Sequence, residues 1–322
     1  MKQARQALLS LLIVGIGLAG CGSIAGEKVA LRSGGGGAHV PLPTPGTPKE
    51  VQTLVADSVH IRDLNANVAA ELANQDGLNA RYFYHGNCAL ITGCAYGDTS
   101  SQTVVVLFGD SHAVMWMPGM VPAVKKLGVK LILLSKNSCP IAELLDPVYL
   151  RGSPGIDCAA WRMASIAAIQ ALSPRLVVLS ERTARVVTGQ RNAPYTKAQW
   201  EAGLDATIEQ LQTRATRVAV MEDITAYATF WPNQCLAAFP HDVQACSVPN
   251  PNPQTPGQQR AELTSAHATG AVFVATNKWF CTARCVPVVG NLLTQYDWNH
   301  VSAPYATFLS GVLEGTIQKL LK

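Results

Sequence analysis

The sequence predicts an α/β fold in which a parallel β-sheet is covered by helices on both faces. Five short runs rich in Val, Ile and Leu recur along the chain, and helical patterns lie between them, an alternation typical of a parallel sheet. The runs are apolar at consecutive positions, which indicates burial on both faces. The five expected strands are Thr103–Phe108, Val129–Ser135, Arg175–Ser180, Arg217–Met221 and Ala271–Val274.

Helices are expected in most of the remaining chain. One amphipathic helix is predicted ahead of the sheet, over Lys49–Ala73. The last helix begins near Pro304, where a missing N–H in the first turn does no harm. Thr225–Gly257 is predicted to be an irregular insertion, a kind of loop that often serves as a lid or binding loop. The other expected helices are Met115–Leu127, Cys158–Leu172, Lys197–Arg214, Gln258–Ala268 and Pro304–Leu321.

The N-terminal residues predict an export signal and a tether. Lys2 and Arg5 precede an apolar run, Ala7–Gly20, which is short for a membrane-spanning helix and suits a signal peptide. The run ends in Leu-Ala-Gly followed by Cys21, a pattern similar to the lipobox of bacterial lipoproteins, in which the Cys is lipidated. An ordinary secretory signal with a chance Cys is the alternative. The dense Gly and Pro residues that follow cannot pack a core.

These features predict four segments. Residues 1–21 are a lipoprotein signal peptide, and residues 22–48 are a flexible Gly/Pro-rich tether. Residues 49–99 form an N-terminal helix with a disulfide-stapled lead-in, and residues 100–322 form the α/β domain. We therefore expect an extracytoplasmic domain that is lipid-anchored to a bacterial membrane.

Composition and charge exclude several classes of protein. Apolar residues make up 48% of the chain, enough to bury a sizeable core and to exclude wholesale disorder. The 25 basic and 21 acidic residues give a formal charge of +4, with no dense basic run beyond the first residues. We therefore expect no nucleic-acid partner. A single long apolar stretch excludes a multi-pass membrane protein.

The cysteines predict disulfides. Nine are present, so Cys21 leaves eight, an even number in an exported chain. Eight cysteines allow 105 pairings, among which the sequence alone cannot choose. Proximity favours Cys88–Cys94, Cys139–Cys158, Cys235–Cys246 and Cys281–Cys285. A zinc site is not expected, because no second close Cys/His pair supplies the remaining ligands.

A candidate nucleophile follows the first strand directly. The strand runs into Gly109-Asp110-Ser111-His112, and ligands of open parallel sheets bind beyond the carboxyl ends of the strands. A Ser on a sharp strand-to-helix turn faces solvent, and its N–H can face a developing oxyanion. Because a Ser is inert at its own pKa, it needs a base.

The expected base lies after the last strand. Asp297 and His300 are three residues apart just before the terminal helix, so one loop can place the imidazole over Ser111 while Asp297 holds its far nitrogen. Gly-Asp-Ser and Asp-x-x-His are each weak signals. The prediction of a triad depends on their positions, because one motif follows the first strand and the other follows the last strand of an exported α/β chain.

The block Val105–Trp116 resembles block I of the SGNH hydrolases, the GDSL-like esterases. It is most similar to SGNH domains fused to acyltransferase-3 membrane proteins, which carry the same Gly-Asp-Ser-His-Ala and a following Trp. The resemblance covers about residues 85–321. Further matches lie at Asn137–Pro140, Trp279–Cys281, Cys285–Pro287, Gly290–Asn291 and Asp297–Ser302.

The resemblance implies a three-layer flavodoxin-like fold, a Ser-His-Asp triad, and O-acyl ester chemistry on cell-envelope glycans without a cofactor. The chain departs from SGNH enzymes after the third strand, where Ser-Glu-Arg-Thr (180–183) replaces Gly-x-Asn-Asp. The oxyanion hole is then expected to combine the Ser111 N–H with Asn137 or a backbone N–H near Arg182. The membrane acyltransferase half is also missing, so transfer would need a separate membrane acyl-donor protein.

Neighbouring residues are expected to have plainer roles. Asp110 and His112 are expected to fix the Ser111 turn through hydrogen bonds rather than touch substrate. The strand-end carboxylates Glu181, Glu222 and Asp223 are expected to lie in solvated loops. Trp116 is expected to lie in the core. Trp231, in the irregular insertion, is a candidate for stacking on a glycan.

Three functions follow from these expectations. The first is an exported lipoprotein that acts as a serine esterase or O-acyltransferase on envelope polysaccharide or peptidoglycan. The second is a small-ester or lipid esterase on the same scaffold, which the polar insertion disfavours. The third is a non-catalytic glycan-binding lipoprotein with a vestigial triad, because fold alone does not determine function.

Overall fold

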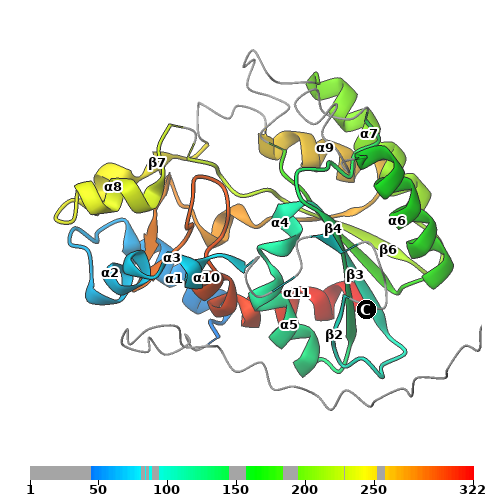
Figure 1. Ribbon diagram of the computed structural model, residues 1–322, viewed down its shortest axis with the longest axis horizontal. Helices are drawn as coiled ribbons and strands as arrows, with labels where there is room; N and C mark the ends of the chain where they lie inside the picture. Colours follow the sequence, from blue (N-terminus) through cyan, green and yellow to red (C-terminus); the bar gives the residue numbers. More distant parts are fainter. Residues whose placement is uncertain are drawn as a thin grey trace, which may run out of the picture. The chain divides into compact units, whose positions relative to one another are not determined.

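The computed structural model describes residues 45–80, 84, 87–88, 94–144, 157–183, 195–227, 229–251 and 258–322 (Figure 1). The chain divides into two units, residues 1–39 and 40–322, and the structure described below belongs to the second. The expected signal peptide, Cys21 and most of the tether lie outside the described residues and stay predictions. None of the helices in the described ranges combines the length and apolar character needed to cross a membrane.

A parallel sheet forms the centre of the second unit, with strand order β4-β3-β5-β6-β8. The five predicted parallel strands are therefore confirmed. Two short strands, β1 (Asn87–Cys88) and β2 (Ala95–Gly97), pair antiparallel with β4 and extend the sheet. The parallel strands are β3 (Val104–Gly109), β4 (Lys130–Lys136), β5 (Leu176–Ser180), β6 (Arg217–Met221) and β8 (Val272–Val274).

Side chains alternate along each parallel strand between two hydrophobic cores. Val105 and Leu107 of β3 face the first core, which α5 and α11 cover, while Val106 and Phe108 face the second, which α6, α7 and α9 cover. Figure 1 shows these two groups of helices on opposite sides of the sheet. Burial on both faces explains why the strands are apolar at consecutive positions. The covering helices are α5 (Met117–Lys126), α6 (Cys158–Leu172), α7 (Lys197–Leu211), α9 (Gln258–Thr269) and α11 (Ser310–Leu321).

The single helix expected over residues 49–73 is wrong, because the chain forms two helices there. The first, α1 (Pro48–Ser58), begins at a capping box in which Thr47 and Glu50 bond each other's backbone N–H groups. The second, α2 (Ala66–Ala73), begins where the Asn65 side chain accepts from the Val68 N–H. Between them, the Leu64 N–H donates to the Pro240 carbonyl, so a contact distant in sequence fixes the turn.

The helix expected over Met115–Leu127 is confirmed as α5, whereas the expected C-terminal helix is interrupted. The segment after β3 forms a short helix α4 (Ser111–Val114) and then α5, which has a Pro within its first two positions. The C-terminal segment forms α10 (Ala303–Phe308) and α11, which begins after Leu309. Pro lacks the N–H that would continue a preceding helix, so it favours a new helix start. The short helix α4 begins with Ser111, which therefore lies on the first helical turn after β3.

The insertion over residues 225–257 is more regular than expected. It contains α8 (Pro232–Ala238), the 3-10 helix η4 (Val243–Cys246) and β7 (Val248–Pro249), which pairs with β9 (Arg284–Cys285). With α2, α3 (Gln75–Leu78), and the hairpin of β10 (Val288–Val289) and β11 (Leu292–Leu293), it encloses a third, smaller core. Buried side chains of this core include Val68, Leu78, Leu236, Val243 and Leu293.

All four disulfides favoured by sequence proximity are present. They are Cys88–Cys94, Cys139–Cys158, Cys235–Cys246 and Cys281–Cys285. Each closes a loop of 4 to 19 residues, so every bond fixes local structure rather than joining distant segments.

Candidate active site

The candidate nucleophile sits where β3 meets α4, at the carboxyl edge of the sheet. A side chain at Gly109 would collide with the Ser180 carbonyl oxygen of the neighbouring strand, so only Gly permits this close approach. Asp110 caps α4 by accepting from the His112 N–H at 2.8 Å. Within the described residues the Ser111 N–H has no hydrogen-bond partner, which leaves it available to a ligand.

The structure brings Ser111, His300 and Asp297 into one hydrogen-bonded chain. His300 Nε2 lies 2.9 Å from Ser111 Oγ, and His300 Nδ1 lies 2.7 Å from Asp297 Oδ2. The second oxygen of Asp297 accepts the backbone N–H groups of Asn299 at 2.9 Å and of His300 at 2.7 Å. This turn fixes the carboxylate against the imidazole. The three residues have the geometry in which a base can take the proton of a Ser hydroxyl.

The environment keeps His300 neutral and Asp297 ionised. Burial lowers the pKa of His300, and the charge of His112 lowers it further, against the opposing effect of the Asp297 hydrogen bond. For Asp297, burial raises the pKa, but the hydrogen bonds and charge of His300 and the backbone N–H groups lower it overall. A neutral imidazole beside an ionised carboxylate is the state required of a general base.

A second His–Asp pair lies directly behind the first. His112 Nδ1 is 2.6 Å from Asp223 Oδ1, and each side chain is only 1% exposed. The Thr183 N–H and hydroxyl both donate to Asp223 Oδ2 at 3.0 Å. Burial raises the pKa of Asp223, but His112 and Thr183 lower it overall, so the carboxylate is ionised. The imidazole rings of His112 and His300 lie 4.9 Å apart.

Asn299 joins the two His–Asp pairs. Its amide oxygen faces Arg182 Nε at 3.3 Å and His112 Nε2 at 3.1 Å, the orientation that the Arg nitrogen, which can only donate, requires. Its amide nitrogen then lies 3.3 Å from Asp297 Oδ1, to which it donates, and 3.0 Å from His300 Nδ1. Asn299 is only 3% exposed, so these contacts hold the centre of the Asp297–His300 turn from inside the protein.

Arg182 lies beside the triad, but its backbone N–H is not the free oxyanion donor that was expected. Its backbone N–H donates to Asp110 Oδ2 at 3.3 Å and so is not free for an oxyanion. Its guanidinium instead stacks over the Trp298 ring at 4.1 Å. Burial lowers the pKa of Arg182, and the carboxylates of Asp223, Asp110 and Asp297 oppose this. Among the described residues, its two terminal nitrogens have no hydrogen-bond partner.

Asn137, the other expected oxyanion donor, directly follows β4, the strand next to β3. It therefore lies at the same sheet edge as Ser111. The next residue, Ser138, has a positive φ of 68°, and Cys139 is held by its disulfide to Cys158. The backbone after Asn137 is thus tightly turned. The expected role of Asn137 as an oxyanion donor stays a prediction.

The strand-end carboxylates expected in solvated loops are buried. Glu181 accepts from the Ile141 N–H at 2.7 Å, and burial together with the Asp110 charge raises the pKa of Glu181 to about 8. Burial likewise raises the pKa of Glu222. It raises the pKa of Glu262, which accepts from the Asp223 N–H at 2.7 Å, well above its ordinary value. The expectation fails because each carboxylate has a partner far away in the sequence.

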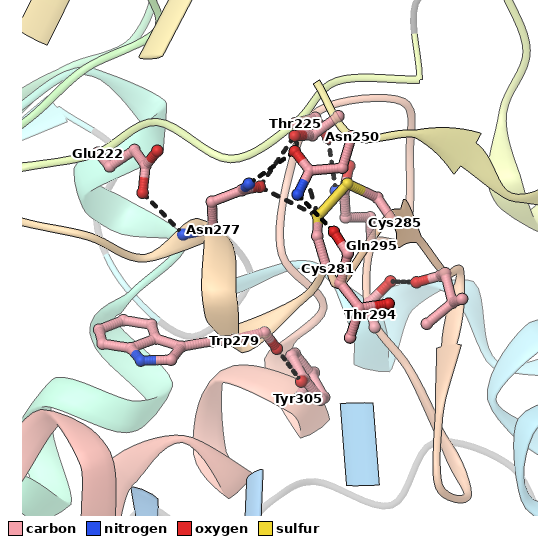
Figure 2. Close-up of a disulfide and its surroundings, with 12 residues drawn as sticks. Glu222, Thr225, Asn250, Asn277, Trp279, Cys281, Cys285, Thr294, Gln295 and Tyr305 are labelled. Carbon is pink, nitrogen blue, oxygen red and sulfur yellow. Dashed lines mark hydrogen bonds between the residues drawn. A yellow bond between two sulfur atoms is a disulfide. The ribbon is translucent and has the colours of Figure 1, made fainter. Parts of the chain in front are cut away.

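A cluster of polar side chains surrounds the Cys281–Cys285 disulfide (Figure 2). Asn277 lies at its centre: its N–H donates to Glu222 at 2.9 Å, and its side chain bonds Asn250 at 2.9 Å and Thr225 at 3.0 Å. Gln295 donates to the Thr225 carbonyl at 2.9 Å. The segment after β6, the insertion and the disulfide turn therefore hold the base loop together.

Sequence reasoning missed two residues of this site, Asp223 and Asn299. Asp223 follows β6 at the same sheet edge as Ser111, and Asn299 directly precedes His300. These positions in the sequence could have indicated that both residues lie near the triad. Of the tryptophans, Trp116 is buried and donates to Ser180 Oγ at 3.1 Å, whereas Trp231 is 45% exposed. The described residues contain no group of three His, Cys, Asp or Glu side chains placed to hold a metal ion.

Among solved structures, a bacterial periplasmic domain has the same fold. The periplasmic domain of a lipopolysaccharide acetyltransferase from Salmonella ser. Paratyphi A has a TM-score of 0.58 at 15% identity, covering 79% of this chain and 97% of that chain. A GDSL-like lipase from Parabacteroides merdae has a TM-score of 0.42 at 14% identity, covering 70% and 97%. A catalytic mutant of an acetylxylan esterase from Geobacillus stearothermophilus has a TM-score of 0.43 at 13% identity, covering 70% and 95%.

Comparison with protein families identifies the chain more directly. Among curated proteins, no sequence matches it. The family model described as the SGNH domain fused to AT3 domains matches residues 89–315, more than two thirds of the chain, and this range contains both the Gly-Asp-Ser turn and the base loop. The chain therefore belongs to the family of SGNH domains that occur fused to AT3 domains.

Proposed function

We propose that this protein is an extracytoplasmic serine esterase or O-acyltransferase that acts on O-acyl groups of cell-envelope glycans. Ser111 is the nucleophile, His300 the general base and acid, and Asp297 the residue that orients His300. Membership of the SGNH family supports an esterase or acyltransferase. The observation that carries the proposal is the hydrogen-bonded chain from Ser111 Oγ to His300 at 2.9 Å and from His300 to Asp297 at 2.7 Å.

The reaction proceeds in two halves. Ser111 Oγ attacks the acyl carbonyl carbon and gives its proton to His300 Nε2. The bond from carbon to the leaving oxygen then breaks, His300 returns the proton to that oxygen, and an acyl-Ser111 ester remains. A water molecule or a sugar hydroxyl, deprotonated by His300, attacks the carbonyl carbon of this ester. The bond from carbon to Ser111 Oγ breaks, and His300 returns the proton to Ser111 Oγ. Water gives hydrolysis, and a sugar hydroxyl gives transfer.

The oxyanion of each tetrahedral intermediate needs hydrogen-bond donors beside Ser111. The Ser111 N–H is one, because no described residue occupies it. For the second donor we favour the Arg182 guanidinium over Asn137. Arg182 contacts residues on both sides of the nucleophile, through Asp110 and through Asn299 beside His300. A preorganised cation at this position stabilises a developing negative charge.

Several features support a glycan substrate outside the cytoplasm. Four disulfides suit an oxidising compartment. The half-buried Trp298 beside Arg182 and the exposed Trp231 offer aromatic faces, which suit sugar rings. The similar Salmonella domain belongs to a lipopolysaccharide acetyltransferase. Lipidation of Cys21 would hold the enzyme at a bacterial membrane, where a membrane acyl-donor protein could supply the acyl group.

The proposal is tested with the full chain and p-nitrophenyl acetate. Turnover is compared between the wild type, Ser111→Ala and the control Ser100→Ala, which alters an exposed Ser of the loop before β3. We expect Ser111→Ala to lose about 10⁴-fold or more in kcat/KM and the control to match the wild type. Intact-mass analysis should show one acetyl adduct that Ser111→Ala lacks.

The outcomes separate the three functions. Turnover that is unchanged in Ser111→Ala would overturn the triad. A folded, oxidised wild type with neither turnover nor adduct would instead indicate a glycan-binding protein. If the acyl enzyme forms, acetylated envelope glycan and long-chain p-nitrophenyl esters are offered in parallel, and faster release from the long-chain ester would favour a lipid esterase. Including an acceptor glycan distinguishes transfer from hydrolysis.

A further inference from the structure

The buried pair of His112 and Asp223 is not used by the reaction described above. His112 is next to the nucleophile in sequence, yet its side chain turns into the protein, where it is 1% exposed. A buried His can be neutral or charged, and its two ring nitrogens report which, because a nitrogen without a proton can only accept a hydrogen bond.

The partners of His112 require a proton on both nitrogens. Nδ1 faces the ionised Asp223 carboxylate at 2.6 Å, so Nδ1 must donate. Nε2 faces Asn299 at 3.1 Å, and the contact of Arg182 Nε with the same amide fixes the amide oxygen on that side. Since an amide oxygen only accepts, Nε2 must donate as well. The ring is then an imidazolium.

We propose that His112 is a positioning residue that acts as a permanent buried cation, anchored by Asp223, and that it holds the loop of Asp297 and His300 through Asn299. The identity of His300 as the base rests on the proposed function above, but the charge of His112 does not. The nucleophile and base are thus joined twice, once through the reacting hydrogen bond and once through the chain from His112 to Asn299.

The cation also acts on His300 electrostatically. The two rings are 4.9 Å apart in a site shielded from water, where charges interact more strongly than in bulk water. Burial is the largest cause of the lowered pKa of His300, and the charge of His112 acts in the same direction. His300 therefore stays unprotonated and ready to accept the Ser111 proton. Once protonated, it is a stronger acid towards the leaving oxygen.

Other charges around the two rings must be included. The carboxylate of Asp297 favours protonation of His300, and so does the more distant Asp110. Asp110 also accepts from the His112 backbone N–H. Glu262, whose pKa burial raises well above its ordinary value, accepts from the Asp223 backbone N–H. Glu222 and Asp223 interact through their charges, and the Arg182 guanidinium contacts the network through Asn299.

The charge of His112 is tested on the full wild-type chain by NMR with ¹⁵N-labelled histidine. The His112 signals are assigned by comparison with His112→Gln. We expect both ring nitrogens of His112 to carry protons at pH 8, where an ordinary exposed His has lost one. A His112 ring with one unprotonated nitrogen at pH 8 would overturn the proposal. This readout is made on the wild type and needs no activity.

The effect on His300 is tested by its titration in the same spectra. In His112→Gln the pKa of His300 should rise, and the acid limb of kcat/KM for p-nitrophenyl acetate should move to higher pH with it. The control is His241→Gln, which removes an exposed His paired with Asp63 and should leave both unchanged. A merely structural loss would lower activity without moving the titration. If the chain has no esterase activity, the NMR titration still decides the proposal, so the two failures are distinguishable.

Discussion

Replacing Asp297 by Asn is the sharpest test of the candidate triad, because one atom changes and the backbone turn survives. In the wild type, Oδ1 accepts the N–H groups of residues 299 and 300, and Oδ2 accepts His300 Nδ1–H at 2.7 Å. In Asp297→Asn the amide oxygen keeps both backbone bonds, and the NH₂ group faces Nδ1. The imidazole must then place its proton on Nε2, which faces Ser111 and can no longer accept.

The expected loss follows from the charge and the tautomer together. For two unit charges about 4 Å apart at an effective dielectric of about 20, the Asp297 carboxylate stabilises protonated His300 by about 4 kcal/mol, or about 10³-fold in rate. The wrong tautomer adds to this, so we expect kcat to fall by about 10³–10⁴-fold, the size of effect known for triad carboxylates. KM should change little, because substrate binding does not need the carboxylate.

The assay is the pH dependence of p-nitrophenyl acetate turnover by Asp297→Asn, with Asp242→Asn as the control. Asp242 is an exposed carboxylate that pairs only loosely with Arg62, at 3.6 Å, so its loss should leave kcat unchanged. Thermal unfolding should confirm that both variants are folded. A folded Asp297→Asn variant within tenfold of the wild type at neutral pH would refute the assignment of Asp297 as the orienting residue.

Three further predictions concern the surroundings of the triad. Arg182→Ala should lower kcat by about 10²–10³-fold with little change in KM, as expected for loss of an oxyanion donor, and an unchanged kcat would remove Arg182 from that role. The folded-state pKa of Glu181 is raised from 4.5 to about 8, so the folded protein binds the extra proton between these values. The free energy of unfolding should therefore fall as pH rises from about 4.5 to about 8, and Glu181→Gln, followed by urea denaturation, should reduce this slope. Replacing both Cys139 and Cys158 by Ser opens a 19-residue separation and should lower the free energy of unfolding by about 3 kcal/mol in the same assay, and a loss below about 1 kcal/mol would contradict this.

The sheet could be predicted from the sequence because its strands are buried on both faces. Runs such as the one that forms β5 are apolar at four consecutive positions, a pattern that few other structures produce. The positions of Ser111 and His300 followed from the same reasoning, since residues after parallel strands gather at one sheet edge. Only short-range patterns and one general rule of α/β sheets were needed.

The helix breaks and the buried polar network could not be predicted in this way. The turn before α2 depends on a bond from Leu64 to Pro240, which no local pattern shows. Asp223 looked like a solvated loop residue because its partners, His112 and Thr183, are 111 and 40 residues away. Burial of a charge becomes apparent only when its distant partners are known.

The separation of 189 residues between Ser111 and His300 has a consequence for biogenesis. The nucleophile is synthesised well before its base, and the base loop is followed by α10 and α11, whose side chains join the core on the α5 face of the sheet. If the chain is exported as proposed, it carries an inert Ser until its last segment has docked. Under the proposed function, esterase activity would then appear only when folding is complete, and a partly translocated chain could not attack the esters of the membrane that it is crossing.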